Sequence, residues 1–228
     1  MSVLRARGVT AAYRGIEVVH GVDLDVAEGE IVGVLGRNGM GKSSLLGALA
    51  GLVARPQGTL EVDGVRIPPH RPVALARAGV SFLPENRGVF PTLTVAENLA
   101  LARRRDGPAI DLSEVYPLLR DRAKQAAGTL SGGQQQQLGI ARAVLATRRL
   151  IAIDELTHGL QPSMVVETFA LLRRVADTGA GVLVVDQNPE LVAANCDRVV
   201  VIEGGAVLLD RRVEDGVLAE IRSLLVLR

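Results

Sequence analysis

The sequence predicts an α/β fold in which a mainly parallel sheet is flanked by helices and interrupted by a helical insert. An unbroken apolar run at Ile31–Leu35 is typical of a buried parallel strand. Strand-like and helix-like patterns alternate from residue 150 to the end of the chain. Between Pro84 and about residue 127 the strand-like runs disappear. Such alternation indicates strands covered by helices on both faces, and the strand-free segment indicates the insert.

The length and composition restrict the fold and the function. With 228 residues, 48% of them hydrophobic and 22% charged, the chain suits one compact domain and is not disordered. Its 26 basic and 25 acidic residues leave a net charge of +1, so we expect no nucleic-acid partner. A single cysteine, Cys196, excludes a disulfide framework and is compatible with a reducing cytosol. We expect neither a signal peptide nor a membrane-spanning segment, so work at a membrane would need separate partners.

The individual elements follow from periodicity. Val22, Leu24 and Val26 alternate with aspartates, which predicts a half-buried strand. Further strands are expected at 31–35, 59–62, 80–83, 150–153, 181–185, 198–202 and 206–209, and helices at 43–53, 71–78, 94–105, 111–122, 135–146, 162–176 and 189–194. Thr94 and Asp111 are the expected N-caps of the two helices in the insert.

A glycine-rich stretch between the first buried strand and the following helix fits the pattern G-x-x-x-x-G-K-[ST]. Backbone N–H groups of such a loop converge on phosphate oxygens, Lys42 places a point charge on the β- and γ-phosphates, and Ser43 offers its hydroxyl to Mg²⁺. The alternative is a loop that merely needs glycine. Against it, one of only two lysines in an arginine-rich chain stands here. The predicted nucleotide-binding residues are Gly36, Arg37, Asn38, Gly39, Met40, Gly41, Lys42, Ser43 and Ser44.

Two carboxylates, Asp154 and Glu155, follow the apolar strand at Leu150–Ile153. Asp154 is expected to hold Mg²⁺ through water, and Glu155 to polarise the attacking water. A pair of acids at a strand end is also compatible with a helix N-cap. The phosphate loop upstream favours the catalytic interpretation.

A third motif, LSGGQ, occupies residues 130–134 ahead of a predicted helix. Ser131 can cap that helix, and the N–H groups of Gly132 and Gly133 can face an anion, although a simple cap also explains the pattern. With the other two motifs in the same order, the chain resembles the ATP-binding-cassette ATPases. The resemblance implies a P-loop, RecA-like core with an antiparallel β part in residues 1–84 and 150–228, and a helical subdomain at about 85–149. It also implies ATP and Mg²⁺ as cofactors, ATP hydrolysis, and a head-to-tail dimer in which Ser131, Gly132, Gly133 and Gln134 cap the ATP of the other cassette.

The resemblance also assigns individual residues. Residues 36–43 match the Walker A loop, 151–154 match the end of Walker B, and Glu155 matches the catalytic carboxylate. Tyr13 lies where the family stacks an aromatic ring on adenine, although a core tyrosine is the alternative. Residues 157–161 match the loop that touches the partner cassette.

Three positions depart from the family pattern. Glu85 stands where most cassettes have glutamine, and its carboxylate can reach Mg²⁺ but repels the γ-phosphate unless it is neutralised. Gln187 replaces a histidine; it can donate a hydrogen bond to the γ-phosphate but cannot become cationic. Leu156 replaces the usual proline after Glu155, which is expected to loosen that turn.

The departures at Glu85 and Gln187 resemble the paired ATPases of branched-chain amino-acid importers. Residues 134–138 and 159–163 also resemble the ATPase of urea importers. We therefore expect a second cassette subunit, favouring a different chain over an identical copy, together with membrane permease subunits and, indirectly, a substrate-binding protein. The expected location is the cytoplasmic face of the membrane, and residues 85–94, with Phe90, are the expected contact to the permease. A non-transport cassette and a nucleotide sensor with little turnover remain as alternatives.

Overall fold

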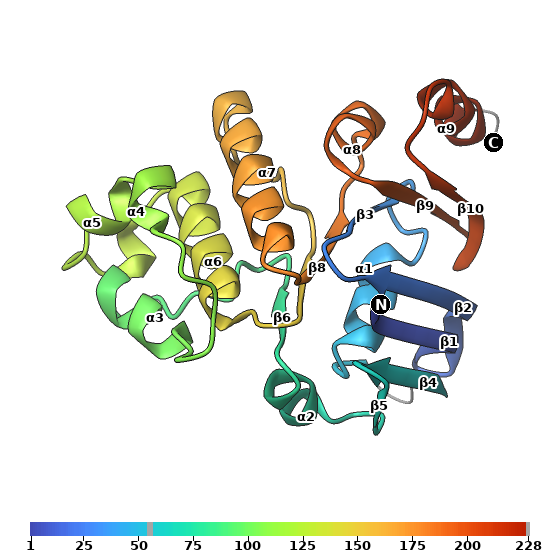
Figure 1. Cartoon of the computed structure of the whole chain (residues 1–228), viewed down its shortest axis with the longest axis horizontal. Coiled ribbons are helices and arrows are strands. Elements are labelled where there is room, and N and C mark those ends of the chain that lie inside the picture. The colour runs from blue at the N-terminus through green and yellow to red at the C-terminus, as the bar shows by residue number, and fades with distance from the viewer. Residues whose placement is uncertain (54–56, 227–228) are drawn as a thin grey trace.

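The computed structural model describes residues 1–53 and 57–226 and contains two sheets (Figure 1). The first is antiparallel, in the order β2-β1-β4-β5, and comprises β1 (Ser2–Tyr13), β2 (Ile16–Ala27), β4 (Gln57–Val62) and β5 (Val65–Ile67). The second has the order β10-β9-β3-β8-β7-β6 and comprises β3 (Ile31–Leu35), β6 (Val80–Leu83), β7 (Leu150–Ile153), β8 (Gly181–Val185), β9 (Arg198–Glu203) and β10 (Ala206–Arg212). Its strand pairs are parallel except β9–β10. The predicted fold class is confirmed.

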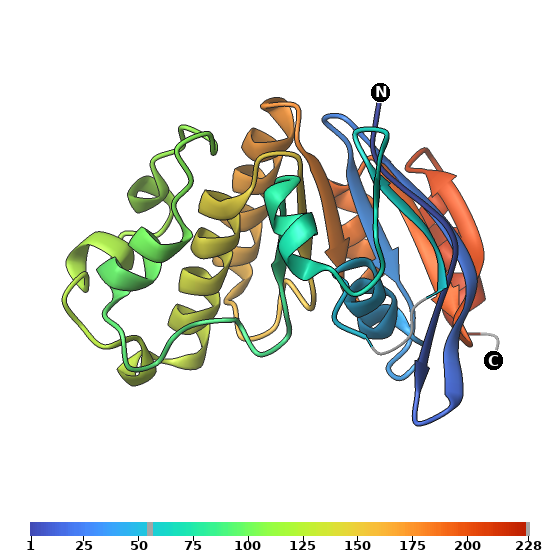
Figure 2. The same cartoon turned by 90° about the horizontal axis from the view of Figure 1, so that it is seen from below.

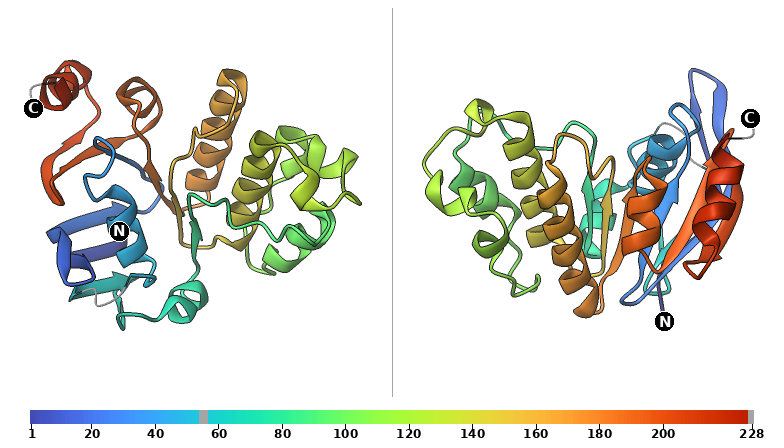
Figure 3. Two further views of the ribbon diagram at one scale, coloured as in Figure 1. Left: turned by 180° about the vertical axis from the view of Figure 1, so that it is seen from behind. Right: turned by 90° about the horizontal axis from the view of Figure 1, so that it is seen from above.

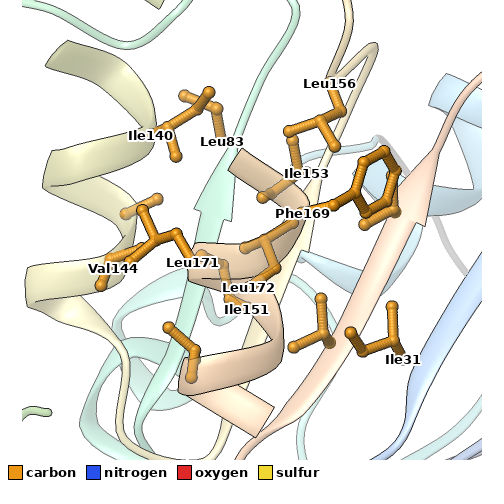
Figure 4. Close-up of a cluster of buried hydrophobic side chains, with 14 of the residues drawn as sticks. Ile31, Leu83, Ile140, Val144, Ile151, Ile153, Leu156, Phe169, Leu171 and Leu172 are labelled. Carbon is orange, nitrogen blue, oxygen red and sulfur yellow. The ribbon is translucent and has the colours of Figure 1, made fainter. Parts of the chain in front are cut away.

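The core lies on both faces of the second sheet. Every residue of β3, β7 and β8 is buried, as their uninterrupted apolar sequences predict. On one face, α1 (Lys42–Leu49) packs between the two sheets, with Leu45 and Leu46 buried beside Leu24 of β2. On the other face, α6 (Gly132–Ala146) and α7 (Pro162–Asp177) cover the strands, and Figure 4 shows Val144 and Leu172 within this cluster.

The helical insert occupies one end of the molecule, opposite the antiparallel sheet (Figure 2). It contains α3 (Val95–Ala102), α4 (Leu112–Val115), α5 (Leu118–Asp121), the 3₁₀ turn η1 (Ala127–Thr129) and α6. Thr94 forms a capping box with Glu97, and the Asp111 side chain accepts a hydrogen bond from the Ser113 N–H. Both predicted N-caps are therefore confirmed.

The prediction of one helix at 111–122 is wrong. The chain forms α4 and α5 instead, separated at Tyr116 and Pro117. Pro117 has no N–H to donate and disfavours helical geometry at the residue before it, and Tyr116 accordingly has φ −123° and ψ 82°. The break leaves Tyr116 fully buried, with its hydroxyl 2.7 Å from Thr168 Oγ1 on α7.

The remaining differences concern short or terminal elements. Helix α1 ends at Leu49 rather than at residue 53, because Gly51 takes a left-handed φ of 70° and turns the chain. The helix expected at 94–105 is α3 and ends at Ala102, the one expected at 71–78 is α2 (Pro72–Arg77), and the one expected at 189–194 is α8 (Pro189–Asn195). A further helix, α9 (Val217–Val226), packs beside α8 (Figure 3). Among the described residues, no helix combines the length and apolarity needed to cross a bilayer.

Candidate ATP-binding and hydrolysis site

The phosphate loop joins β3 to α1, and its lysine is held inside the loop. The Lys42 side chain is buried, and Nζ donates to the carbonyl oxygens of Gly36 at 2.8 Å and Arg37 at 2.9 Å. Burial lowers the pKa of Lys42, while the carboxylates of Glu155, Asp154 and Asp186 act in the opposite direction. The ammonium group is therefore placed at the base of the loop with acidic groups nearby.

Two glycines of the loop are required by close packing. A Cβ at Gly36 would lie 2.3 Å from the Ile202 carbonyl oxygen, and one at Gly41 would lie 2.7 Å from the Val18 carbonyl oxygen. Gly41 also has a left-handed φ of 99°. Gly39, in contrast, has no neighbour within 4 Å of an added Cβ. The loop is thus packed against β9 and β2, and its backbone at Gly39 is unobstructed.

Ser43 and Asp154 meet at the start of α1. The Ser43 hydroxyl donates to Asp154 Oδ1 at 3.2 Å, although the two residues are 111 positions apart. Burial raises the pKa of the Asp154 carboxyl, and the nearby charges of Glu155 and Glu85 raise it further, whereas the Ser43 hydrogen bond lowers it. Glu85 itself is exposed in the loop after β6.

A magnesium ion fits this pair of oxygen ligands. Mg²⁺ is commonly held by one or two carboxylates together with substrate phosphates. Within residues 1–53 and 57–226 no group of three or more His, Cys, Asp or Glu side chains could hold a metal alone. Ser43 and Asp154 therefore suit an ion that shares its coordination with a nucleotide, rather than a metal site built from protein alone.

Glu155 lies between two loops. It has a left-handed φ of 49°, and its carboxylate accepts hydrogen bonds from Gln187 Nε2 at 3.1 Å and His158 Nδ1 at 2.9 Å. Asp186 ties the loops together, because Oδ1 accepts from the Gln187 N–H at 2.7 Å and Oδ2 from the Thr157 N–H at 3.3 Å. These residues line a cleft of about 470 Å³, together with Asn188, Pro189 and Glu190.

The sequence predicted no role for Asp186, and it predicted His158 only as part of the 157–161 loop that touches the partner cassette. Asp186 acts through backbone N–H groups, which no motif reveals. His158 stands three residues after Glu155, and the turn that begins with the left-handed φ at Glu155 places its ring beside the carboxylate. Leu156, expected to loosen this turn, is fully buried, and its carbonyl oxygen accepts from Gln136 Nε2 at 3.3 Å.

The LSGGQ motif forms the start of α6. Ser131 caps the helix as predicted, and Gln134 completes a capping box by accepting from the Ser131 N–H at 3.0 Å. A Cβ at Gly133 would lie 2.5 Å from the Gly159 carbonyl oxygen. The motif therefore packs directly on the loop that follows Glu155.

Tyr13 lies at the turn between β1 and β2 and is 48% exposed. The alternative of a core tyrosine is therefore wrong. Stacking of Tyr13 on adenine stays a prediction, as do the roles of the other site residues.

The fold and the arrangement of these groups define a P-loop nucleotide-binding ATPase. The family profile described as ABC transporter matches residues 19–158. The chain therefore belongs to the ABC transporter family of ATP-binding cassettes, whose members hydrolyse ATP.

Curated relatives match over most of the chain. The high-affinity branched-chain amino acid transport ATP-binding protein BraG of Pseudomonas aeruginosa is 34% identical over 207 residues, covering 88% of this chain and 89% of that protein. The lipopolysaccharide export system ATP-binding protein LptB of Escherichia coli K12 is 35% identical over 219 residues, covering 90% and 88%. The two likenesses are about equal.

Solved structures support the fold. An ATP-binding subunit of an ABC transporter has a TM-score of 0.84 at 24% identity, covering 98% of this chain and 99% of that one. A dimeric ATP-binding cassette in a post-hydrolysis state, bound to ADP and Pi, has a TM-score of 0.81 at 24% identity, covering 92% and 99%.

Proposed function

We propose that the chain is the ATP-hydrolysing subunit of an importer for branched-chain amino acids. The observation that carries the ATPase assignment is the convergence of Lys42, Ser43, Asp154 and Glu155 at one edge of the second sheet. The cargo assignment is supported by the likeness to BraG and by Glu85 and Gln187, which resemble the importer pattern. An ATPase of a lipopolysaccharide-type exporter is the second candidate, because LptB is equally similar. A urea or amide importer is the third.

Each site residue has a proposed role. The loop from Gly36 to Ser43 binds the ATP phosphates through backbone N–H groups and Lys42. Ser43, Asp154 and Glu85 are the proposed ligands of Mg²⁺, which would neutralise phosphate charge when bound. Glu155 accepts a proton from the attacking water, and Gln187 donates to the γ-phosphate. Tyr13 stacks on adenine.

Hydrolysis requires a second cassette in this proposal. ATP on the loop of one chain is capped by Ser131, Gly132, Gly133 and Gln134 of the other, and a different chain is the favoured partner. Because the phosphate loop lies on the core (1–84 and 150–228) and the motif on the helical subdomain (about 85–149), closure rotates one part against the other.

The movement is transmitted to permease subunits at the cytoplasmic face of the membrane, with a substrate-binding protein acting beyond them. Phe90, in the loop between the two parts, is 48% exposed and stacks its ring 4.6 Å from the Arg142 guanidinium. It offers an apolar contact to a permease segment.

Two measurements test the proposal. Glu155→Gln is expected to bind ATP without turnover and to form an ATP-dependent dimer in light scattering; a monomer in the presence of ATP and both the paired cassette and the permease contradicts the dimer account. Deletion of the gene is expected to abolish uptake of radiolabelled leucine. Normal leucine uptake with loss of urea uptake would favour the urea or amide importer. Normal leucine uptake with an outer-membrane lipopolysaccharide defect would favour the exporter.

A further inference from the structure

The Glu155 carboxylate is held on both sides, and one of the two holding residues has no assigned role. Gln187 Nε2 donates to Oε1 at 3.1 Å, and His158 Nδ1 lies 2.9 Å from Oε2. A carboxylate can only accept hydrogen bonds, so Nδ1 carries the proton of this contact. Each carboxylate oxygen can accept two hydrogen bonds, which leaves acceptor sites free for a water molecule.

The backbone fixes the position of the imidazole. Glu155 has a left-handed φ, and the His158 N–H donates to the Glu155 carbonyl oxygen at 3.1 Å, closing a tight turn. Leu156 anchors that turn in the hydrophobic core near Ile153 and Phe169 (Figure 4). Gln136 Nε2 contacts the carbonyl oxygens of both Glu155 and Leu156, at 3.4 and 3.3 Å. The contact between His158 and Glu155 is therefore set by a turn that its own backbone hydrogen bond, Leu156 and Gln136 hold in place.

A second His–Glu pair shows what an ordinary surface contact looks like in this chain. His20 Nδ1 lies 3.0 Å from Glu17 Oε1, also at a spacing of three residues, and both side chains are about half exposed. The His158 side chain is 60% exposed, but that of Glu155 is only 23% exposed. The Glu155 carboxylate also has a second side-chain donor and opens into the cleft beside Asp186. Exposed pairs such as His20 and Glu17 contribute little to stability.

We propose that His158 is a positioning residue that orients the Glu155 carboxylate toward the attacking water. The inference rests on the proposed role of Glu155. Gln187 and His158 each contact one carboxylate oxygen, and the two contacts together favour the orientation of the carboxylate toward the cleft. The loop after β8 has Gln187 and so presents an amide to Glu155. The loop after Glu155 presents the imidazole of His158 from the other side. Lys42 and Ser43, which are proposed to bind the nucleotide, do not depend on His158.

Three variants of the chain, each assembled with the partner cassette and the permease subunits, test this inference by steady-state ATPase kinetics. His158→Ala is expected to lower kcat by about ten- to hundredfold, with KM for ATP changed less than about twofold, because misplacing a catalytic group affects the reaction rather than nucleotide binding. His158→Asn is expected to restore most of kcat, since its amide nitrogen can occupy the place of Nδ1. His20→Ala, which removes the comparable surface pair, is the matched control and is expected to leave both constants unchanged.

The outcomes separate this inference from the proposed function. Glu155→Gln is measured beside the other variants, and their thermal unfolding is compared with that of the wild type. If Glu155→Gln retains turnover, the assignment of Glu155 fails and this inference fails with it. If Glu155→Gln is inactive while His158→Ala keeps the wild-type kcat, only this inference is overturned. Equal losses in His158→Ala and His158→Asn, or a parallel rise in KM, overturn it as well.

Discussion

Replacement of Gly133 by alanine tests the packing of the LSGGQ motif on the loop after Glu155. The added Cβ would lie 2.5 Å from the Gly159 carbonyl oxygen, whereas ordinary contact begins at 3.4 Å, so the two backbones must separate by about 0.9 Å. Overpacking of this kind costs about 1–3 kcal/mol. In a chain of this size that corresponds to a fall in Tm of about 2–12 °C.

The neighbouring glycine provides the control. A Cβ at Gly132 would meet only the end of the flexible Arg87 side chain, at 3.3 Å. Both glycines lie at the start of α6, so alanine changes intrinsic helix preference similarly at each. Thermal unfolding followed by circular dichroism is expected to show a lower Tm for Gly133→Ala than for Gly132→Ala. Equal values would refute the close packing of Gly133 on Gly159.

Three further predictions concern other parts of the molecule. Lys42→Ala is expected to weaken ATP binding by about tenfold to a hundredfold in calorimetric titration, because a charge-assisted contact worth about 1.5–3 kcal/mol is lost; retained affinity would contradict the phosphate-loop assignment. Asn98→Ala is expected to lower the free energy of unfolding in urea by about 2–3 kcal/mol, because the buried side chain bonds the backbone N–H and carbonyl of Phe90 at 2.9 and 3.0 Å; an unchanged midpoint would speak against it. Burial raises the pKa of Cys196 to about 12, so the native thiol is expected to resist thiol reagents at pH 8 and to react on unfolding. The thiol has a higher pKa in the folded than in the unfolded chain. Its contribution to the free energy of unfolding is therefore complete below about pH 8.5 and declines at higher pH, as the unfolded thiol ionises. Rapid reaction of the native protein with a thiol reagent would contradict the burial of Cys196.

The parts that were predictable from the sequence are those governed by local rules. Thr94, Asp111 and Ser131 mark helix starts because a side-chain oxygen satisfies free N–H groups within three residues. The buried strands follow from apolar runs, and the phosphate loop follows from fixed spacing. Pro117 also carried a local signal, and the single helix predicted across it ignored that signal.

The parts that were not predictable depend on contacts between distant segments. Helix α9 is stabilised by burial of Ile221 and also forms an exposed ion pair between Arg222 and Glu190 at 2.6 Å, and neither contact is visible in its own sequence. The two hydrogen bonds to the Glu155 carboxylate require a left-handed backbone at a non-glycine residue and the approach of Gln187 from the loop after β8. No residue pattern predicts either feature.

The most direct test of the account is a structure of the Glu155→Gln chain with Mg²⁺ and ATP, formed with its partner cassette. The account predicts phosphate oxygens within hydrogen-bond distance of Lys42 Nζ and of the glycine-rich loop, and a γ-phosphate capped by the LSGGQ motif of the opposing cassette. A nucleotide bound elsewhere, or one whose γ-phosphate meets no group from a second cassette, would contradict it.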